Sequence, residues 1–232
     1  YAIGATDEEW LRAQLDDDND HVRVWALRLL ADDGTFGAPT IAKMRQLTQT
    51  DPSGLVRLYL ASTLQRLPLE SRWDIADALA QHAADAQDRA LPLMIWYGIE
   101  PAIPTDPGRS IALAERSKIG LLRRLIARRL TSDLELQPAA VDQLLQLIGT
   151  GNDADFQLDI LQGMNGALRG WRKAPQPKTW PRAAEIVFSS APEKVQEQAR
   201  QLGVVFGDGQ AISELRDIVT DTDAAAVTRR NA

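Results

Sequence analysis

The fold of this chain is decided by one stretch of sequence, Val22-Arg-Val-Trp-Ala-Leu-Arg-Leu-Leu30. Its apolar residues recur at spacings of three and four, which is the period of an amphipathic helix. The predicted apolar stripe of this helix consists of Val22, Trp25, Ala26, Leu29 and Leu30. Residues suited to helix capping precede it at 18–20, and Asp-Asp-Gly34 follows it. The stretch therefore predicts one helix with a short turn on each side.

The same pattern recurs along the whole chain at nearly constant intervals. The recurring segments begin at Val22, Val56, Leu91, Leu122, Phe156, Val195 and Val227. The steps between them are 34, 35, 31, 34, 39 and 32 residues. Each step is the length of two helices of about 12 residues joined by short turns. Repeats of this length are typical of an α-solenoid, in which helix pairs stack because one pair cannot bury its apolar stripe alone.

We therefore predict an all-α fold, a right-handed α-solenoid (α-α superhelix) of about six to seven helical hairpins. The whole chain, 1–232, is predicted to be a single repeat domain in which a loop at 170–180 interrupts the repeat. The outer helices are predicted at 6–15, 39–49, 71–83, 107–117, 138–148, 180–189 and 211–219. The inner helices are predicted at 21–31, 53–66, 90–100, 120–130, 153–169, 192–206 and from 223 onward. The last helix stops before a cap, which predicts a fragment of a longer protein; a natural frayed terminus is the alternative.

The composition excludes several kinds of chemistry. The 232 residues include no cysteine and two histidines, which excludes disulfides, iron–sulfur clusters and thiol nucleophiles and argues against structural zinc. Acidic residues outnumber basic ones by 32 to 26, and the net charge of −6 argues against a general polyanion-binding protein. The apolar runs are far shorter than the roughly 20 residues of a transmembrane helix. Because no complete catalytic constellation is present, we predict no cofactor, metal site or catalytic residue in this chain.

The densest positive charge in this acidic chain is a cluster of six basic residues within 14 positions. This basic cluster consists of Arg116, Lys118, Arg123, Arg124, Arg128 and Arg129. On a helix that begins near residue 120, Arg124 and Arg128 share one face. One interpretation is ion pairing between repeats, and the acids suggested for it are Glu100, Glu115, Asp133 and Glu135. The other is a site for an anion or a partner protein on the concave surface.

The six tryptophans divide into two groups. Four lie inside predicted helices, where core packing is expected: Trp10, Trp25, Trp73 and Trp96. The other two, Trp171 and Trp180, flank the basic, proline-containing segment 172–178. This segment is interpreted either as a contact loop or as a solvated connection that its aromatic residues attach to the solenoid.

An aspartate precedes a Val-Arg pair by five residues in the first two repeats. It is Asp17 before Val22-Arg23 and Asp51 before Val56-Arg57. This spacing resembles HEAT repeats, a family in which the aspartate and the arginine form hydrogen-bonded ladders between neighbouring repeats. Later repeats place other residues where the aspartate would lie: Ser117, Gly151, Ser190 and Thr222. The resemblance implies a HEAT-like solenoid with a ladder in its first two repeats, and it leaves the ladder open beyond them.

Two further stretches extend the resemblance. They are Leu91-Pro-Leu-Met-Ile-Trp-Tyr-Gly-Ile-Glu-Pro-Ala102 and Ser117-Lys-Ile-Gly-Leu-Leu-Arg-Arg-Leu-Ile-Ala-Arg-Arg-Leu130. Together with 22–28, they resemble the HEAT region of large bacterial membrane-bound dehydrogenases, which combine a sorbosone-dehydrogenase-like β-propeller, HEAT repeats and a C-terminal c-type cytochrome module. Gly120 stands where that family usually has proline. The resemblance, strong over 21–130, implies an exported, redox-linked parent protein in the periplasm or cell envelope. It implies no haem in this chain, because the Cys-x-x-Cys-His motif is absent.

The resemblance supplies no catalytic residue and favours a non-catalytic scaffold that positions neighbouring domains or another protein. The candidate surface for a partner or an anion consists of Trp96, Tyr97, Glu100, Lys118, Arg123, Arg124, Arg128 and Arg129. Neither nucleic acid nor membrane insertion is predicted. The alternative function is a HEAT-like DNA-processing enzyme of the alkylpurine DNA glycosylase type, which needs a basic groove and an acidic residue near the flipped base. The net charge of −6 favours the scaffold, and a free-standing adaptor protein is a third hypothesis.

Overall fold

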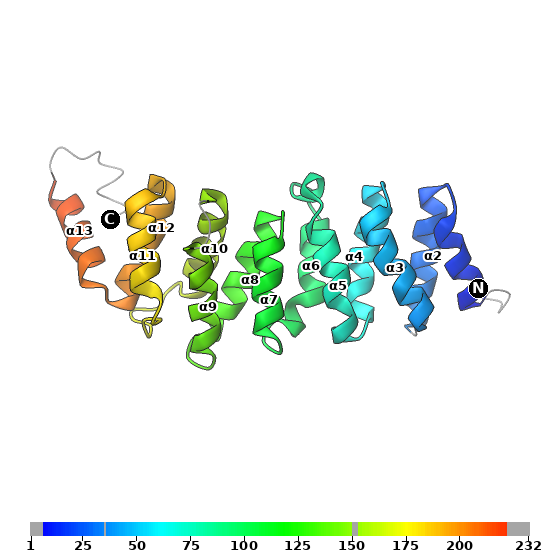
Figure 1. Cartoon of the computed structure of the whole chain (residues 1–232), viewed down its shortest axis with the longest axis horizontal. Coiled ribbons are helices and arrows are strands. Elements are labelled where there is room, and N and C mark those ends of the chain that lie inside the picture. Colours follow the sequence, from blue (N-terminus) through cyan, green and yellow to red (C-terminus); the bar gives the residue numbers. More distant parts are fainter. Residues whose placement is uncertain (1–6, 35, 150–152, 222–232) are drawn as a thin grey trace. The chain divides into compact units, whose positions relative to one another are not determined.

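The computed structural model describes residues 7–34, 36–149 and 153–221. Within these ranges every regular element is a helix and no strand is present, as Figure 1 shows. The chain divides into two compact units, Tyr1–Leu122 (unit 1) and Arg123–Ala232 (unit 2), and each is described by itself. Both units are built from helical hairpins that follow one another along the chain. The predicted all-α, solenoid-like fold is therefore confirmed.

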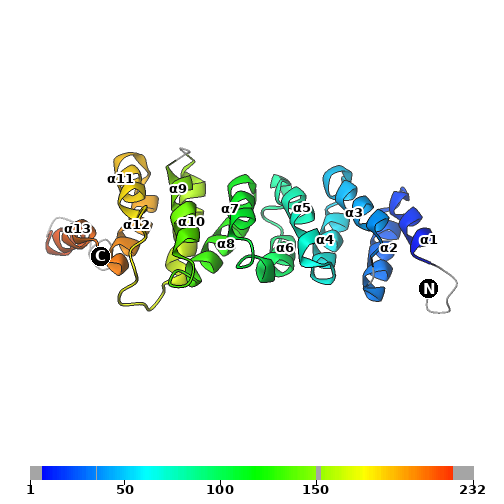
Figure 2. The same ribbon diagram turned by 60° about the horizontal axis from the view of Figure 1, so that its bottom comes forward.

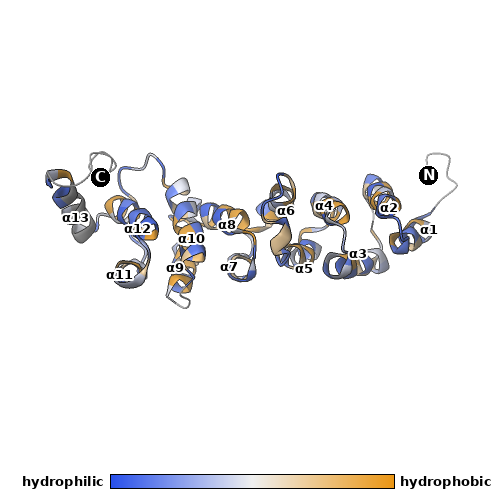
Figure 3. Ribbon diagram, turned by 90° about the horizontal axis from the view of Figure 1, so that it is seen from above, coloured by the Kyte–Doolittle hydropathy of each residue, from blue (hydrophilic) through white to orange (hydrophobic). Residues whose placement is uncertain are grey.

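Unit 1 contains two layers of helices (Figures 1 and 3). Its outer layer consists of α1 (Glu8–Ala13), α3 (Ala38–Thr50), α5 (Leu69–Ala80) and α7 (Pro107–Arg116). Its inner layer consists of α2 (Asp20–Asp33), α4 (Gly54–Thr63) and α6 (Leu91–Ile99). Short 3-10 turns extend these helices: η1 (Gln14–Asp16), η2 (Leu64–Arg66), η3 (Ala83–Asp85) and η4 (Glu100–Ala102). Each helix packs on the next one of its layer, α2 on α4 on α6 and α3 on α5 on α7.

Unit 2 by itself also alternates inner and outer helices (Figure 2). The boundary between the units falls within α8 (Gly120–Ser132), which is followed by the inner helices α10 (Ala154–Ala167) and α12 (Glu193–Phe206). The outer helices are α9 (Pro138–Ile148) and α11 (Trp180–Ser190). α10 packs on α12, α9 packs on α11, and α13 (Gly209–Thr220) packs on α12. Residues 168–179 connect α10 to α11 without a helix.

The local sequence accounts for where several helices begin. Proline stands in the first turn of α3, α7, α9 and α11, where its missing N–H leaves no hydrogen bond unmade. Pro192, the first residue of the helix predicted at 192–206, is instead the N-cap of α12. Asp106 caps α7 by accepting a hydrogen bond from the N–H of Arg109 at 2.9 Å. The helix predicted from 223 onward lies outside the described residues, as do Gly151 and Thr222.

The inner helices bury the same positions in the six repeats whose inner helices the structure describes. Four residues after the first apolar residue, the buried side chains are Ala26, Leu60, Ile95, Ile126, Ile160 and Ala199. Eight residues after it, the buried residues are Leu30, Leu64, Ile99, Leu130, Met164 and Gly203. Because every hairpin presents the same apolar positions to its neighbours, the core of each unit is a series of similar layers.

The predicted apolar stripe of α2 is wrong at Trp25, which is 56% exposed. Val22 and Leu29 are only half-buried, whereas Val24 and Leu27, outside the predicted stripe, are buried. The reason is that α2 packs against both α1 and α4, so its buried face is wider than the stripe and rotated from it. The exposed side of α2 carries Trp25, and the guanidinium carbon of Arg28 lies 4.5 Å from the centroid of its ring.

Candidate functional site

Two buried arginines connect neighbouring hairpins of unit 1. Arg23 on α2 donates hydrogen bonds to both carboxylate oxygens of Asp51, at 2.7 and 2.9 Å. Arg57 on α4 donates to both carboxylate oxygens of Asp85, at 2.6 and 2.8 Å. Each guanidinium also donates to a backbone carbonyl before its own helix, that of Asp17 for Arg23 and that of Asp51 for Arg57. Because these bidentate bonds fix one hairpin on the next, the predicted ladder has a structural role.

The ladder extends one repeat further than the spacing of the first two repeats indicates. Asp85 lies at the end of η3, six residues before Leu91, and an alignment at five residues points to Ala86 instead. One additional residue in the connection between α5 and α6 therefore hides this rung in the sequence. The next inner helix carries Pro92 where α2 and α4 carry arginine, so it offers no guanidinium for a further rung.

Much of the basic cluster takes part in ion pairs. Arg116 pairs with Asp77 at 2.9 Å, and Arg129 pairs with Asp133 at 2.8 Å. Asp133 is one of the acids that the sequence suggested. Asp77 was missed, because it lies on α5 and approaches Arg116 only through the packing of α7 against α5. Ion pairing between repeats is therefore one role of this cluster.

Two arginines of the cluster share one carboxylate in unit 2. Arg123 and Arg124 each place a guanidinium nitrogen 3.3 Å from an oxygen of Asp159 on α10. The Asp159 side chain is only 11% exposed; this burial raises the pKa of Asp159, and the two positive charges act in the opposite direction. The guanidinium carbon of Arg123 also lies 5.5 Å from the centroid of the Phe156 ring. These contacts connect α8 to α10.

Arg128 and Lys118 differ from the rest of the cluster. Arg128 is exposed and extends over Gly166, with its Cδ 3.6 Å from where a Cβ on that glycine would lie. Its guanidinium has no ion-pair partner among the residues that the structure describes. Lys118, in unit 1, is exposed, and its backbone N–H donates to the carbonyl of Ala80 at 2.8 Å. Arg128 therefore presents an uncompensated positive charge in unit 2.

A groove of about 570 Å³ lies beside Arg124 in unit 2. Its walls come from α8, α10 and α12 and from the residues directly after α10. The polar side chains that line it are Arg124, Gln162, Asn165, Arg169, Gln198 and Gln201. Trp171, which is 38% exposed, lines it as well. No acidic residue is among those that line this cavity, which we call the unit 2 groove.

The amides of the unit 2 groove were not among the candidates that the sequence suggested. Asn165 Nδ2 donates to the backbone oxygen and to the side-chain Oε1 of Gln198, both at 3.0 Å. The side chains of Gln162 and Gln201 make no hydrogen bond within the part of the chain that is described. Both glutamines lie six residues after the first apolar residue of their repeats, the position that Arg128 holds in the preceding repeat. This shared register is the signal in the sequence that leads to them.

Two aromatic side chains on inner helices of unit 1 are exposed. Trp25 on α2 is 56% exposed and Tyr97 on α6 is 50% exposed. Tyr59 on α4, between these two helices, is half-buried, and so is Trp96 beside Tyr97. The prediction of core packing is therefore wrong for Trp25, because the side of α2 that carries it has no neighbouring helix in the described part of unit 1. Trp10, 51% exposed on the outer helix α1, is not in the core either.

The remaining tryptophans differ in burial. Trp73 and Trp180 are buried, and Trp180 packs edge-to-face on Phe206 with the ring centroids 5.0 Å apart. The connection 168–179 is attached to unit 2 at Ala174, whose N–H donates to the carbonyl of Val205 at 2.9 Å. Of the two tryptophans that flank the basic segment, Trp180 thus belongs to the core and Trp171 to the groove.

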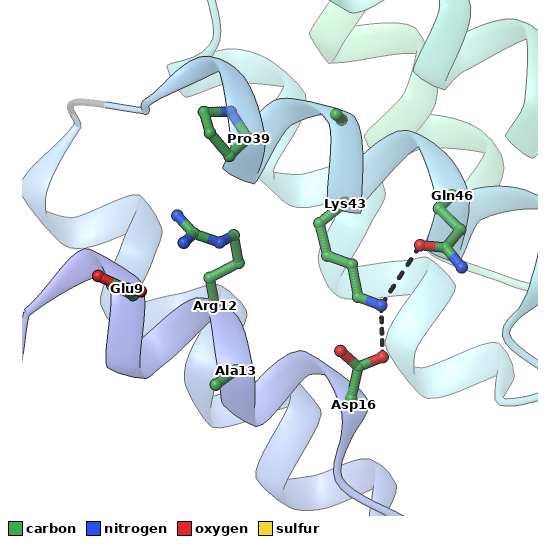
Figure 4. A pocket seen from close by; sticks show the side chains of 8 residues that line it. Glu9, Arg12, Ala13, Asp16, Pro39, Lys43 and Gln46 are labelled. Carbon is green, nitrogen blue, oxygen red and sulfur yellow. Dashed lines mark hydrogen bonds and ion pairs between the residues drawn. The ribbon is translucent and has the colours of Figure 1, made fainter.

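A second cavity, of about 440 Å³, lies between α1 and α3 in the outer layer of unit 1 (Figure 4). Its charged lining residues balance one another: Glu9, Arg12, Asp16 and Lys43. Lys43 Nζ donates to the carboxylate of Asp16 and to the amide oxygen of Gln46. Because two acidic and two basic side chains line this cavity, it favours neither an anionic nor a cationic ligand.

The predicted docking residues fall into both units. Trp96, Tyr97, Glu100 and Lys118 belong to unit 1, and Arg123, Arg124, Arg128 and Arg129 belong to unit 2. Glu100 is half-buried in η4, directly after the helix that carries Tyr97. Two candidate surfaces result, an aromatic one on the inner layer of unit 1 and the basic, amide-lined groove of unit 2.

No helix in the described ranges is long and apolar enough to cross a membrane. Among the same residues, no group of three or more histidine, aspartate or glutamate side chains is placed to hold a metal ion. A scan against protein-family models and searches of the curated proteins and of the solved structures found no match to this chain.

Proposed function

We propose that this chain is a non-catalytic, protein-binding scaffold that positions neighbouring domains or partner proteins. The single observation that carries the proposal is the exposure of Trp25 and Tyr97 on the inner layer of unit 1. The resemblance of 21–130 to the HEAT region of bacterial membrane-bound dehydrogenases supports a parent protein that is exported and redox-linked. On that basis the partners are the other domains of the parent protein, and the location is the periplasm or the cell envelope.

An exposed aromatic side chain leaves a large apolar surface in contact with water. Tryptophan and tyrosine carry such surfaces, and both are enriched at the centres of protein interfaces. Trp25 and Tyr97 lie on α2 and α6, which pack on opposite sides of α4, where Tyr59 adds a third ring. The guanidinium carbon of Arg28 lies 4.5 Å from the centroid of the Trp25 ring, which is a cation–π contact. A partner that covers this aromatic surface removes its apolar area from water.

The DNA-processing alternative finds less support in the same residues. Such an enzyme needs a free acidic group beside a basic groove. The buried acid nearest to Arg124 is Asp159, and both of its carboxylate oxygens are engaged by arginines. A net charge of −6 also opposes the approach of a nucleic acid. These observations favour a protein partner.

Alanine substitutions in the inner layer test the proposal. The affinity of the chain for the neighbouring domains of its parent, produced separately, is measured by titration calorimetry. We expect Trp25→Ala and Tyr97→Ala each to weaken binding by about tenfold, because central aromatic contacts dominate interface energies. Trp10→Ala is the matched control, since Trp10 is 51% exposed on an outer helix. Its affinity is expected to remain within about twofold of the unsubstituted chain.

Two results would overturn the proposal. One is an equal loss for Trp10→Ala, which would show that the inner layer has no special role. The other is tight, salt-sensitive binding of duplex DNA together with no binding of any parent domain, which would favour the glycosylase-type alternative. Circular dichroism of each variant shows whether the helices are intact, because Trp25 and Tyr97 are exposed and their removal leaves the core unchanged.

A further inference from the structure

We infer that the unit 2 groove binds an extended peptide segment that carries acidic side chains. The inference rests on the proposed scaffold function and names the chemistry of one partner segment. Three features of the groove lead to it: uncompensated arginines, side-chain amides and one exposed indole ring. Each feature selects for a different part of such a peptide.

The arginines select for carboxylates. Arg169 lines the groove and Arg128 extends over Gly166, which also lines it. Neither guanidinium has an ion-pair partner among the described residues. Arg124, at the same wall, already shares Asp159 with Arg123. Because a guanidinium binds a carboxylate through two parallel hydrogen bonds, Arg128 and Arg169 are suited to two acidic side chains of a ligand.

The amides select for an extended backbone. A side-chain amide offers both a donor and an acceptor, as a peptide group does. The side-chain amides of Gln162 and Gln201 have no hydrogen-bond partner in the described chain, whereas the side-chain amide of Asn165 is hydrogen-bonded to Gln198. A helical ligand satisfies its backbone groups internally and has no use for such amides. An extended ligand has unpaired N–H and C=O groups, which the two glutamines can satisfy.

The indole of Trp171 supplies an apolar contact at the rim of the groove. The main chain at this residue is held by a turn, because the backbone N–H of Trp171 donates to the carbonyl of Leu168 at 3.0 Å. The preceding residue, Gly170, has φ +87°, a backbone conformation that residues other than glycine rarely adopt. The backbone that carries the ring is therefore fixed at the rim of the groove, where the ring can stack on a proline or on the aliphatic part of a glutamate.

Defined probes test the inference by fluorescence anisotropy with the full chain. The probe is a labelled decapeptide of alternating Glu and Pro, which is acidic and cannot form a helix. A decapeptide of alternating Gln and Pro and a ten-nucleotide oligo-dT are the comparison ligands. We expect the acidic peptide to bind at least about tenfold more tightly than its neutral counterpart, because two carboxylate–arginine pairs form only with the former.

Substitutions identify the groove as the site. Arg128→Gln and Arg169→Gln are each expected to weaken binding of the acidic peptide by about tenfold, and Gln201→Ala by about threefold. Arg182→Gln on the outer helix α11 is the matched control, since that arginine is exposed and lies away from the groove lining. Its affinity is expected to be unchanged.

Several outcomes would overturn the inference. They are equal binding of the neutral peptide, an equal loss in Arg182→Gln, tighter binding of oligo-dT than of the acidic peptide, or no binding at about 1 mM peptide. If Trp25→Ala still weakens binding of the chain to the parent domains but the acidic peptide does not bind, this inference fails and the scaffold function stands. If the acidic peptide binds as expected but no parent domain does, the groove is a peptide site and the proposed assembly with those domains fails.

Discussion

Arg57 is one of the two buried arginines that connect neighbouring hairpins of unit 1. Its side chain is buried, and its charge is balanced by Asp85, with a further hydrogen bond to the carbonyl of Asp51. Pairing with Asp85 raises the pKa of Arg57 above its ordinary value, so this group stays charged throughout the range in which the protein is folded. A charge held out of water needs its partner, and the loss of one member costs more than the pair itself contributes.

We expect Asp85→Asn to lower the free energy of unfolding by about 3 kcal/mol, because it leaves Arg57 buried with a neutral partner. Asp74→Asn is the control. Its partner Arg45 lies 3.0 Å away, but both side chains are substantially exposed. That substitution is expected to cost less than about 1 kcal/mol. Urea unfolding followed by circular dichroism measures the free energy of unfolding of both variants. An equal decrease in the two would show that burial of the Arg57–Asp85 pair does not make it more stabilising than an exposed ion pair.

At the scale of the helix, the close approach of α10 to α8 depends on a glycine. A Cβ on Gly163 would lie 2.3 Å from the carbonyl oxygen of Arg124 and 2.7 Å from the Cβ of Ala127. No rotamer relieves a clash with backbone, so a larger residue forces the helices apart. Gly98 on α6 has the same role against Leu64, because a Cβ on Gly98 would lie 2.4 Å from the Cβ of Leu64. Small residues thus set the spacing of inner helices within each unit.

Two alanine substitutions on α10 separate this packing effect from helix propensity. Gly163→Ala is expected to destabilise the chain by about 1–3 kcal/mol, because the clash outweighs the better helix propensity. Gly166→Ala is expected to be neutral or to stabilise by up to about 1 kcal/mol, since its nearest neighbour is the flexible Arg128 Cδ at 3.6 Å. Thermal unfolding distinguishes them. Stabilisation by both would mean that the two helices do not approach closely at Gly163.

At the scale of the molecule, the described hairpins of each unit pack against their neighbours in that unit, so a change in one hairpin affects the stability of those next to it. α4 packs on α2 and α6, and α10 packs on α12, within their separate units. In such arrays the free energy of unfolding is approximately a sum of the stabilities of the repeats and of their nearest-neighbour interfaces. Local opening therefore differs from one part of the chain to another.

Hydrogen exchange measured by mass spectrometry tests this locality. In Asp85→Asn, we expect faster amide exchange in α4 and α6, because the Arg57–Asp85 pair connects α4 to the segment that leads into α6. Exchange in α10 and α12 is expected to be unchanged. A uniform increase across all helices would contradict the expectation, because it would mean that the chain unfolds as one cooperative body.

The sequence by itself determined the helical repeat and most helix bounds. Apolar residues at helical spacing recur about every 34 residues, and this periodicity is a local property that needs no knowledge of neighbours. The first ladder rung was also readable, because Asp51 stands at a fixed distance from its Val-Arg pair. The second rung was hidden by a single additional residue before Leu91.

Only the tertiary structure decided which faces are covered and which charges meet. The side of α2 that carries Trp25 has no described helix over it, although its apolar pattern alone marks that residue for the core. Arg116 meets Asp77, and Arg123 and Arg124 meet Asp159, across 35 or more residues. The groove of unit 2 likewise combines three inner helices with the loop after α10. The physical reason is that burial and pairing depend on neighbours brought close by packing, whereas helix formation depends on residues close in the chain.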